Sequence, residues 1–294
     1  MSLRKAVSHL PAPFDRDEYQ LVRRGVYDGD EEVWRNRAGD FAFLHPRPET
    51  DYSAYVPRVS ALSLSDYKKT RPVIARRFEK IASQFGEKGR VLELGAADAA
   101  FLNHVARERP GWELASVEVD RNTRAARDVL SGLVQYDTLE AAVASGARFD
   151  RVCAFHVLEH VLEPAPFLAD CARCLAPGGR VIFEVPSIDD PLLSLYGCEA
   201  YEAFYFQRQH PYVYSAASLG RLLVENGFAI AATIHHQRYG LENHLQWLTE
   251  GKPGGRERFR ELFAASEAGY LADLERGGRA DTAILVAEPA GARS

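Results

Sequence analysis

The sequence predicts an α/β protein: a doubly wound, Rossmann-like sheet of seven mostly parallel strands with an antiparallel edge strand, an N-terminal extension and a C-terminal lid insertion. Two observations predict this class. Short apolar runs alternate with segments of helical periodicity, an order typical of right-handed βαβ units. One such run, Val91 to Leu94, ends in the small residues Gly95-Ala96-Ala97 before a helical pattern begins. Open α/β sheets hold nucleotide-like ligands at turns of this kind.

Each predicted element follows from a local pattern. Short apolar runs predict strands at 91–94, 114–118, 133–136, 151–155, 180–185, 228–234 and 282–287. Apolar residues that recur every three or four positions predict helices at 66–85, 98–109, 122–130, 139–144, 164–175 and 217–225. Pro177-Gly178-Gly179 predicts a tight turn that leads into the strand at 180–185.

The chain is expected to divide into an extension (1–64), a core (65–235), a substrate or lid insertion (236–281) and a last core strand with a tail (282–294). The extension contains aromatic residues such as Trp34, Tyr52 and Tyr55, and their number is too high for a disordered segment. We therefore expect it to pack on the core, either over the ligand mouth or as an N-terminal cover or dimer arm. The insertion is longer than an ordinary connection, which suggests a function.

Composition argues against several classes of protein. The 294 residues are 46% hydrophobic and 26% charged, as in ordinary globular proteins. A net charge of −5 argues against a nucleic-acid or anionic-membrane partner. No apolar run approaches the roughly 20 residues of a membrane span, and no signal-peptide pattern is present, so a cytoplasmic location is expected. Cys171 and Cys174 lie on the apolar face of a predicted helix, which indicates buried thiols rather than metal ligands.

Two further features indicate chemistry, and a third argues against two nucleotide-binding motifs. Glu93 lies in an otherwise apolar strand, where a carboxylate costs free energy unless a cation or donor meets it. The segment Phe155-His156-Val157-Leu158-Glu159-His160-Val161, with Pro164 after it, follows the predicted strand at 151–155. The turn after Leu94 has neither the glycines of G-x-G-x-x-G nor the Gly-Lys-Ser/Thr ending of a P-loop, so both of those nucleotide motifs fit poorly.

These segments together resemble the class I S-adenosylmethionine (SAM)-dependent methyltransferases, in particular small-molecule enzymes that act on sugars or polysaccharide precursors. Residues 93–99 resemble motif I, E-x-G-x-G-x-G, with Ala97 and Ala99 in place of two glycines. Residues 156–161 resemble the family's hvLEHv signature, and 175–179 resemble its L-x-P-G-G turn. The resemblance covers residues 90–235 and the last strand. The fourth strand lacks the D/N-P-P-Y/F ending of base-modifying amino-methyltransferases.

The resemblance implies SAM as the cofactor and S-adenosylhomocysteine as its product. The residues expected to hold it are Glu93, Gly95, Ala96, Ala97, Asp98, Glu118, Val119, Asp137, Phe155 and His156. A carboxylate suits two ribose hydroxyls, and Glu118 is preferred over Asp120, which would then be an acid favoured at a helix N-terminus. Asp137 would accept the adenine amino group or cap the next helix, and both interpretations stay open.

The predicted activity is methyl transfer to a small polar metabolite, in the first place to a hydroxyl of a sugar or polysaccharide precursor. Such transfer requires alignment of the acceptor and a base. The catalytic candidates are His210 and His156. The substrate-binding candidates are Tyr212, Arg238, Tyr239, Asn243 and His244.

Other functions remain alternatives: C- or N-methylation, a non-catalytic SAM- or nucleotide-binding module, and an NAD(P)-dependent oxidoreductase. The expected partner is a small-molecule acceptor such as a nucleotide sugar, and a homodimer is one expected assembly. No metal is expected, because His235 and His236 point to opposite faces of a strand and no cluster of oxygen ligands accompanies them.

Overall fold

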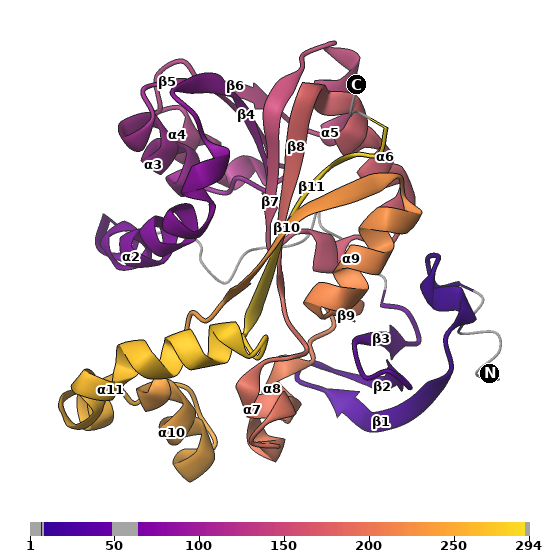
Figure 1. Ribbon diagram of the computed structural model, residues 1–294, viewed down its shortest axis with the longest axis vertical. Coiled ribbons are helices and arrows are strands. Elements are labelled where there is room, and N and C mark those ends of the chain that lie inside the picture. The colour runs from indigo at the N-terminus through magenta and orange to yellow at the C-terminus, as the bar shows by residue number, and fades with distance from the viewer. Residues whose placement is uncertain (1–6, 8, 49–63, 292–294) are drawn as a thin grey trace.

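The computed structural model describes residues 7, 9–48 and 64–291 (Figure 1). At its centre is a seven-stranded sheet in the order β10-β11-β8-β7-β4-β5-β6. Its strands are β4 (Lys88–Leu94), β5 (Gly111–Val117), β6 (Val134–Tyr136), β7 (Phe149–Phe155), β8 (Leu175–Pro186), β10 (Phe228–His236) and β11 (Thr282–Pro289). Only β11 runs antiparallel to its neighbours, β8 and β10. The predicted fold class is confirmed, with the antiparallel strand one position in from the edge.

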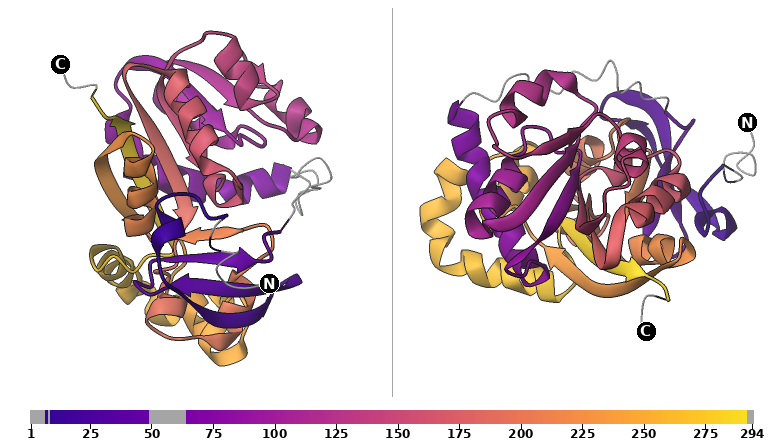
Figure 2. Two further views of the ribbon diagram at one scale, coloured as in Figure 1. Left: turned by 90° about the vertical axis from the view of Figure 1, so that its right-hand side faces the viewer. Right: turned by 90° about the horizontal axis from the view of Figure 1, so that it is seen from above.

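Helices cover both faces of this sheet, because strands of a parallel sheet are apolar on both sides. One face packs in a hydrophobic cluster with α5 (Leu139–Ala144), α6 (Pro164–Cys174) and α9 (Ala216–Glu225). The other face packs with α2 (Leu64–Ile81) and α3 (Ala100–Glu108). Figure 2 shows these layers from two further directions. Cys171 and Cys174 of α6 are buried, as their helical spacing predicts.

Two predicted elements differ from the structure. The helix expected at 122–130 is only a 3₁₀ turn, Arg121–Thr123, and one turn of helix, α4 (Arg124–Arg127). The only buried side chain of α4 is Arg127, so a longer helix would have no apolar face to bury. The turn expected at 177–179 lies inside β8, as an irregularity between the paired positions Leu175 and Arg180.

The N-terminal segment forms a second, antiparallel sheet in the order β1-β2-β3-β9. After a 3₁₀ turn (Phe14–Arg16), its strands are β1 (Tyr19–Val26), β2 (Gly29–Asn36), β3 (Phe41–His45) and, from much later in the chain, β9 (Tyr212–Tyr214). The rings of Phe14 and Phe41 stack with centroids 3.8 Å apart and belong to the same buried cluster as the large sheet. The extension is therefore attached to the core through its aromatic side chains. Tyr52 and Tyr55, which were also expected to pack on the core, lie outside the described residues.

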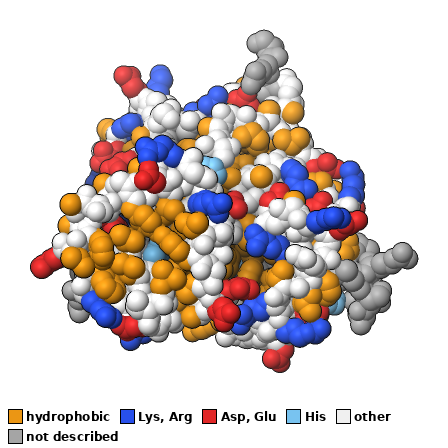
Figure 3. Space-filling view, turned by 60° about the horizontal axis from the view of Figure 1, so that its bottom comes forward, with side chains coloured by type: hydrophobic (Ala, Val, Ile, Leu, Met, Phe, Trp, Pro, Cys, Tyr) orange, Lys and Arg blue, Asp and Glu red, His pale blue; other side chains and the backbone are white. Residues whose placement is uncertain are grey.

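The insertion consists of two helices, α10 (Leu241–Glu250) and α11 (Arg256–Arg276), between β10 and β11. The short helices α7 (Pro191–Ser194) and α8 (Glu199–Tyr205) follow β8 and pack with α10. These helices and the N-terminal sheet lie beyond the carboxyl end of β8 (Figure 1). When the bottom of the molecule in Figure 1 is turned toward the viewer, hydrophobic side chains gather on one part of the surface and charged side chains border them (Figure 3). No described helix is long and apolar enough to cross a membrane.

Candidate active site

The turn after β4 has an unusual backbone. Gly95 has a φ of 69°, and a Cβ placed on it would lie 2.6 Å from Val157 Cγ2, so a side chain would have no room. Ala97 and Ala99 adopt left-handed φ angles of 45° and 59°, which L-residues other than glycine rarely do. Such strain persists where the surrounding structure imposes it, and it clusters at functional sites. Ala96 is buried here, and Asp98 accepts a hydrogen bond from the Ala100 amide.

Glu118, at the end of β5, is bound to this turn. Its carboxylate accepts hydrogen bonds from the backbone amides of Ala97 (2.7 Å) and Asp120 (2.8 Å). Arg127 holds the same turn by donating to the Ala97 carbonyl at 2.8 Å. Asp120 instead accepts from the Asn122 amide and begins the following 3₁₀ turn. A carboxylate has about four lone-pair positions, so Glu118 keeps acceptor capacity for a ligand.

Glu93 provides a buried carboxyl beside the turn. Only 5% of the residue is exposed, and Oε2 has no hydrogen-bond partner among the described residues. Burial raises the pKa of this carboxyl well above its usual value, although the nearby charge of Arg77 opposes the shift. A cationic group bound here would satisfy the unpartnered oxygen and restore the carboxylate. The residues around Gly95 therefore fit a cofactor that carries an amino group.

Asp137 lies at the end of β6 and forms ion pairs with Arg121 (3.3 Å) and Arg124 (3.4 Å). It does not cap α5, because the Thr138 side chain accepts the hydrogen bond from the Ala141 amide. The interpretation of Asp137 as the cap of this helix is therefore wrong, because Thr138 caps α5. Val119 is exposed at the same edge of the sheet.

His156 follows β7 and lies in a chain of buried and half-buried ionisable groups. Its own φ is left-handed at 56°. Nδ1 lies 3.2 Å from Glu159 Oε1, and Nε2 lies 3.0 Å from Glu184 Oε1 and 2.9 Å from Arg238 Nη1. Burial and the Arg238 charge lower the pKa of His156, but hydrogen bonds to the two carboxylates outweigh them and raise it.

Glu184 connects this chain to α2. Arg77 donates to both of its oxygens, at 2.8 and 2.6 Å, and its guanidinium lies 4.7 Å from the ring centre of Phe155. Burial alone would raise the pKa of Glu184, but Arg77 and His156 hold it well below its usual value. Phe155 also packs against Phe101, with ring centres 4.6 Å apart.

Asp281 connects the same chain to the insertion. It accepts from Arg238 Nε at 3.0 Å and from the backbone amides of Arg238 and Tyr239. The six groups of the chain, hereafter the ionic chain, are Arg77, His156, Glu159, Glu184, Arg238 and Asp281. With His156 protonated, they carry three positive and three negative charges. Burial favours such neutrality, because an uncompensated buried charge is costly. An imidazolium with both nitrogens engaged is poorly suited to act as a base.

His210, the other predicted catalytic histidine, lies beside His160 and Glu159. The two imidazole rings have centres 4.8 Å apart, and ligand atoms of all three residues lie within 4.8 Å of one another. Burial lowers the pKa of His210 to about 4, although Glu159 opposes the shift, so its imidazole is neutral at pH 7. One carboxylate and two imidazoles could also ligate a metal ion, a grouping that the sequence analysis did not foresee.

The five predicted substrate-binding residues lie in three different settings. Tyr212 and His244 are buried and hydrogen-bonded within the protein, to the Leu162 carbonyl and to the Tyr270 hydroxyl respectively. Burial lowers the pKa of His244 to about 4. Tyr239 is 47% exposed, with the Arg238 guanidinium over its ring, and Asn243 donates a long hydrogen bond to the Gly254 carbonyl. Arg238 belongs to the ionic chain.

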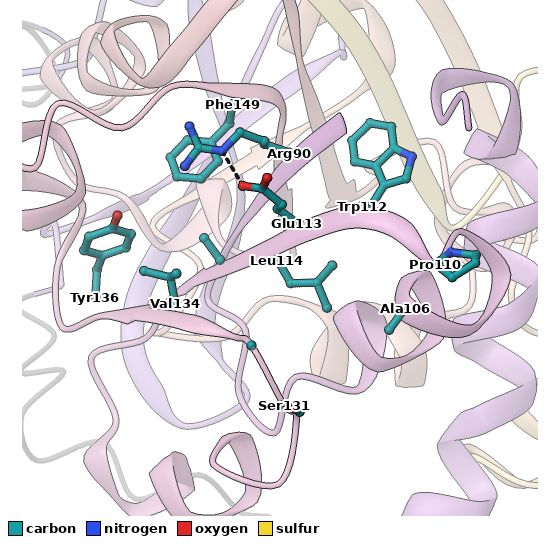
Figure 4. Close-up of a pocket in the computed structure, with 12 residues that line it drawn as sticks. Arg90, Ala106, Pro110, Trp112, Glu113, Leu114, Ser131, Val134, Tyr136 and Phe149 are labelled. Atoms are coloured by element: carbon teal, nitrogen blue, oxygen red, sulfur yellow. Dashed lines mark ion pairs between the residues drawn. The ribbon is translucent and has the colours of Figure 1, made fainter. Parts of the chain in front are cut away.

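A cavity of about 460 Å³ lies away from all these residues (Figure 4). Its walls include the first residues of β5 and β7 and the loop that precedes β6, and an Arg90–Glu113 ion pair lies at 3.1 Å. This is largely the amino end of the parallel strands, whereas ligands of open α/β sheets bind at the carboxyl end. We therefore place the candidate active site at the Gly95 turn and the ionic chain.

Comparison with known families matches residues 67–233, more than half of the chain, to a methyltransferase domain. The chain belongs to the class I SAM-dependent methyltransferases. The ubiquinone biosynthesis O-methyltransferase of Parvibaculum lavamentivorans is 32% identical over 152 residues, 50% of this chain and 54% of the relative. That of Alkalilimnicola ehrlichii is 32% identical over 114 residues, 36% and 46% of the two chains. This methyltransferase thus spans about half the length of these curated relatives.

A solved structure shares the fold. The crystal structure of a SAM-dependent methyltransferase from Archaeoglobus fulgidus matches 76% of this chain and 96% of its own, with a TM-score of 0.50 and 18% identity. The class I family predicted from the motifs is confirmed by the family match, and the comparisons do not show the predicted sugar or polysaccharide-precursor type.

Sequence reasoning missed several residues that build the site of this methyltransferase. Arg77, Glu184 and Asp281 come from α2, β8 and the residue before β11, far apart in the chain. Glu184 carried a usable signal, because a carboxylate inside the apolar strand 180–185 needs a cation as much as Glu93 does. Asp281, next to a polar loop, carried none.

Proposed function

We propose that this protein is a SAM-dependent methyltransferase that methylates a hydroxyl group of a small molecule. The observation that carries the proposal is the left-handed turn at Gly95, Ala97 and Ala99, held to Glu118 at the carboxyl end of the sheet. A tight turn of small residues lets a ligand approach its backbone closely, and the carboxylate bound to it can accept hydrogen bonds from ribose hydroxyls.

Each cofactor-facing residue has a distinct role in this proposal. The residues of the turn, Gly95 to Asp98, lie under the amino-acid end, and Glu93 meets the amino group with its unpartnered oxygen. Glu118 accepts hydrogen bonds from the ribose hydroxyls, while Val119, Asp137 and Phe155 surround the adenine. The bound cofactor supplies a methyl group already activated on a sulfonium.

Oxygen is the proposed acceptor atom because the curated relatives are named O-methyltransferases. A hydroxyl needs a hydrogen-bond acceptor that orients it, and the neutral imidazole of His210 is such a group at pH 7. His156 is assigned to the ionic chain, where its two nitrogens hold Glu159 and Glu184. As the acceptor itself we propose, in the first place, the sugar or polysaccharide precursor that the sequence predicts. All four cysteines are free, which supports the cytoplasm as the compartment.

Calorimetric titration of the full chain with SAM, NAD and ATP in parallel tests the cofactor. We expect micromolar binding of SAM alone. Methyl transfer from labelled SAM to methyl α-D-glucopyranoside, UDP-glucose and catechol then tests the acceptor, with mass spectrometry to identify an O-methyl product. Binding of NAD or ATP in place of SAM would contradict the proposal. SAM binding without transfer to any acceptor would favour a non-catalytic module.

A further inference from the structure

Arg127 is a buried arginine beside the turn that follows β4. Only 3% of the residue is exposed, and it is the only buried side chain of α4. Burying a guanidinium costs free energy unless its N–H groups find hydrogen-bond acceptors. The acceptors that Arg127 has found therefore indicate what the residue contributes.

The N–H groups of Arg127 reach three segments of the chain. Nη1 donates to the Ala97 carbonyl at 2.8 Å and to Thr123 Oγ1, and Nε donates to Gln135 Oε1 at 2.9 Å. Ala97 follows β4, Thr123 follows β5 and Gln135 lies in β6, and these three strands are neighbours in the sheet. One side chain thus connects the three segments that face the cofactor in the proposed function.

Two of these segments have support besides Arg127. Thr123 Oγ1 donates to the Asp120 carbonyl at 2.9 Å, which closes the 3₁₀ turn after β5. Gln135 is paired with Ser116 in the ladder between β5 and β6. These two segments therefore keep hydrogen bonds when Arg127 is removed.

The turn at Ala97 depends on Arg127 in a different way. Ala97 lies between β4 and α3 with a left-handed φ of 45°, which is unfavourable for alanine. Its amide donates to Glu118 at 2.7 Å, and its carbonyl accepts from Arg127 at 2.8 Å. Hydrogen bonds to charged groups are roughly twice as strong as neutral ones, so this pair can offset the cost of the left-handed conformation. Ala99, which is also left-handed, is held within the turn, because its amide donates to the Ala96 carbonyl at 2.7 Å.

We propose that Arg127 is a positioning residue for the cofactor, which holds Ala97 in the left-handed conformation that receives the amino-acid end of SAM. Arg127 acts through the Ala97 carbonyl and does not touch the cofactor. This inference rests on the proposed function, in which the turn lies under the amino-acid end. Without Arg127, Ala97 relaxes toward an ordinary φ, and the turn loses its fit to that end of the ligand.

The test is calorimetric titration of the full chain with S-adenosylhomocysteine and with methylthioadenosine, which lacks the amino-acid end. Arg127→Met should raise the Kd for S-adenosylhomocysteine about tenfold or more and the Kd for methylthioadenosine less than about threefold. Arg107→Met, at an exposed position of α3, is the matched control and should change neither Kd.

A second change at Ala97 tests the proposed cause. Glycine adopts the left-handed conformation readily, so Ala97→Gly in the Arg127→Met background should restore most of the affinity for S-adenosylhomocysteine. Ala99→Gly in the same background should not, because Arg127 does not hold Ala99. If methylthioadenosine binds the wild type too weakly to measure, this pair of double variants decides the question.

Other outcomes overturn the inference. Unchanged affinity of Arg127→Met for S-adenosylhomocysteine would show that the contact with Ala97 is not needed. Equal weakening of both ligands, or no rescue by Ala97→Gly, would make Arg127 a general support of the fold. If Arg127→Met does not fold, as far-ultraviolet circular dichroism would show, Arg127→Lys replaces it in every titration. Failure of the wild type to bind S-adenosylhomocysteine would contradict the proposed function itself.

Discussion

The two halves of the sheet's carboxyl end are built by different means. On the β4–β5 side, backbone conformation shapes the site: left-handed residues at Ala97 and Ala99 and amides bound to Glu118. On the β7–β8 side, buried side chains shape it through the ionic chain, whose members come from α2, β8 and the insertion. In our proposal the β4–β5 side binds the cofactor and is encoded largely in one short segment, whereas the β7–β8 side binds the acceptor and is assembled from distant segments.

Breaking the ionic chain should have the largest effect. Arg77→Met leaves Glu184 buried without its bidentate partner, and loss of one member of such a pair typically costs about 3–5 kcal/mol. Urea unfolding at pH 7 measures this loss in the free energy of unfolding. Arg76→Met, one position earlier on α2, is the control. A second change, Glu184→Gln, should restore part of the stability, and a loss below 1 kcal/mol for Arg77→Met would show that the pair is not essential.

A change on the β4–β5 side should reduce the affinity for the cofactor. Glu118→Ala removes a carboxylate that holds two backbone amides and, in our proposal, the ribose. Charge-assisted hydrogen bonds contribute about 1.5–3 kcal/mol, so the Kd for SAM should rise about 10- to 100-fold. Glu113→Ala, exposed on the same strand, should leave the calorimetric Kd unchanged. SAM affinity that Glu118→Ala does not alter would remove the ribose assignment.

The stability of the β7–β8 side should also respond to pH, through Asp190, a buried residue that caps α7 after β8. Burial and the charge of Asp281 raise the pKa of Asp190 to about 7, although hydrogen bonds from Tyr201 and Leu192 oppose the shift. The unfolded chain ionises this group near pH 4, so between pH 4 and 7 the folded state binds more protons. Stability is therefore lost as pH rises, by about 1.4 kcal/mol per pH unit.

Asp190→Asn removes that dependence and keeps an oxygen for the cap of α7. Urea unfolding at pH 5 and pH 8 should show the variant gaining about 1–3 kcal/mol relative to the wild type at the higher pH. A difference between variant and wild type that does not change with pH would refute the shift.

The smallest expected effect comes from relieving the backbone strain at Ala97, in the turn after β4. The left-handed conformation costs alanine about 1–2 kcal/mol, and the flexibility of glycine costs roughly 0.5–1 kcal/mol. Ala97→Gly should therefore be neutral or stabilise the protein by about 1 kcal/mol, with SAM affinity within threefold of the wild type. Ala100→Gly, in the first turn of α3, should destabilise it slightly. A tenfold loss of SAM binding in Ala97→Gly would mean that the side-chain methyl group of Ala97 contacts the cofactor.

The sequence predicted the parts of the molecule that depend on local patterns. The strands and most helices of the large sheet follow from apolar periodicity, and the helix at 139–144 has the predicted limits. The N-terminal sheet was read only as a folded extension, because it is completed by a strand from residues 212–214. The ionic chain was missed for the same reason. Apart from His156 and Glu159, its members share no spacing, and only the topology brings Arg77 and Asp281 to the same end of the sheet.

The pairing of β3 with β9 has a consequence during protein synthesis. Phe41 lies opposite Tyr214, so the small sheet cannot be completed until the ribosome has passed residue 214. At about 5–20 residues per second, β3 waits roughly 10–35 seconds with one unpaired edge, which can pair with other chains. Slow synthesis or crowding of nascent chains should therefore affect this sheet first. Residues 41–45 are therefore made well before the strand that completes their sheet.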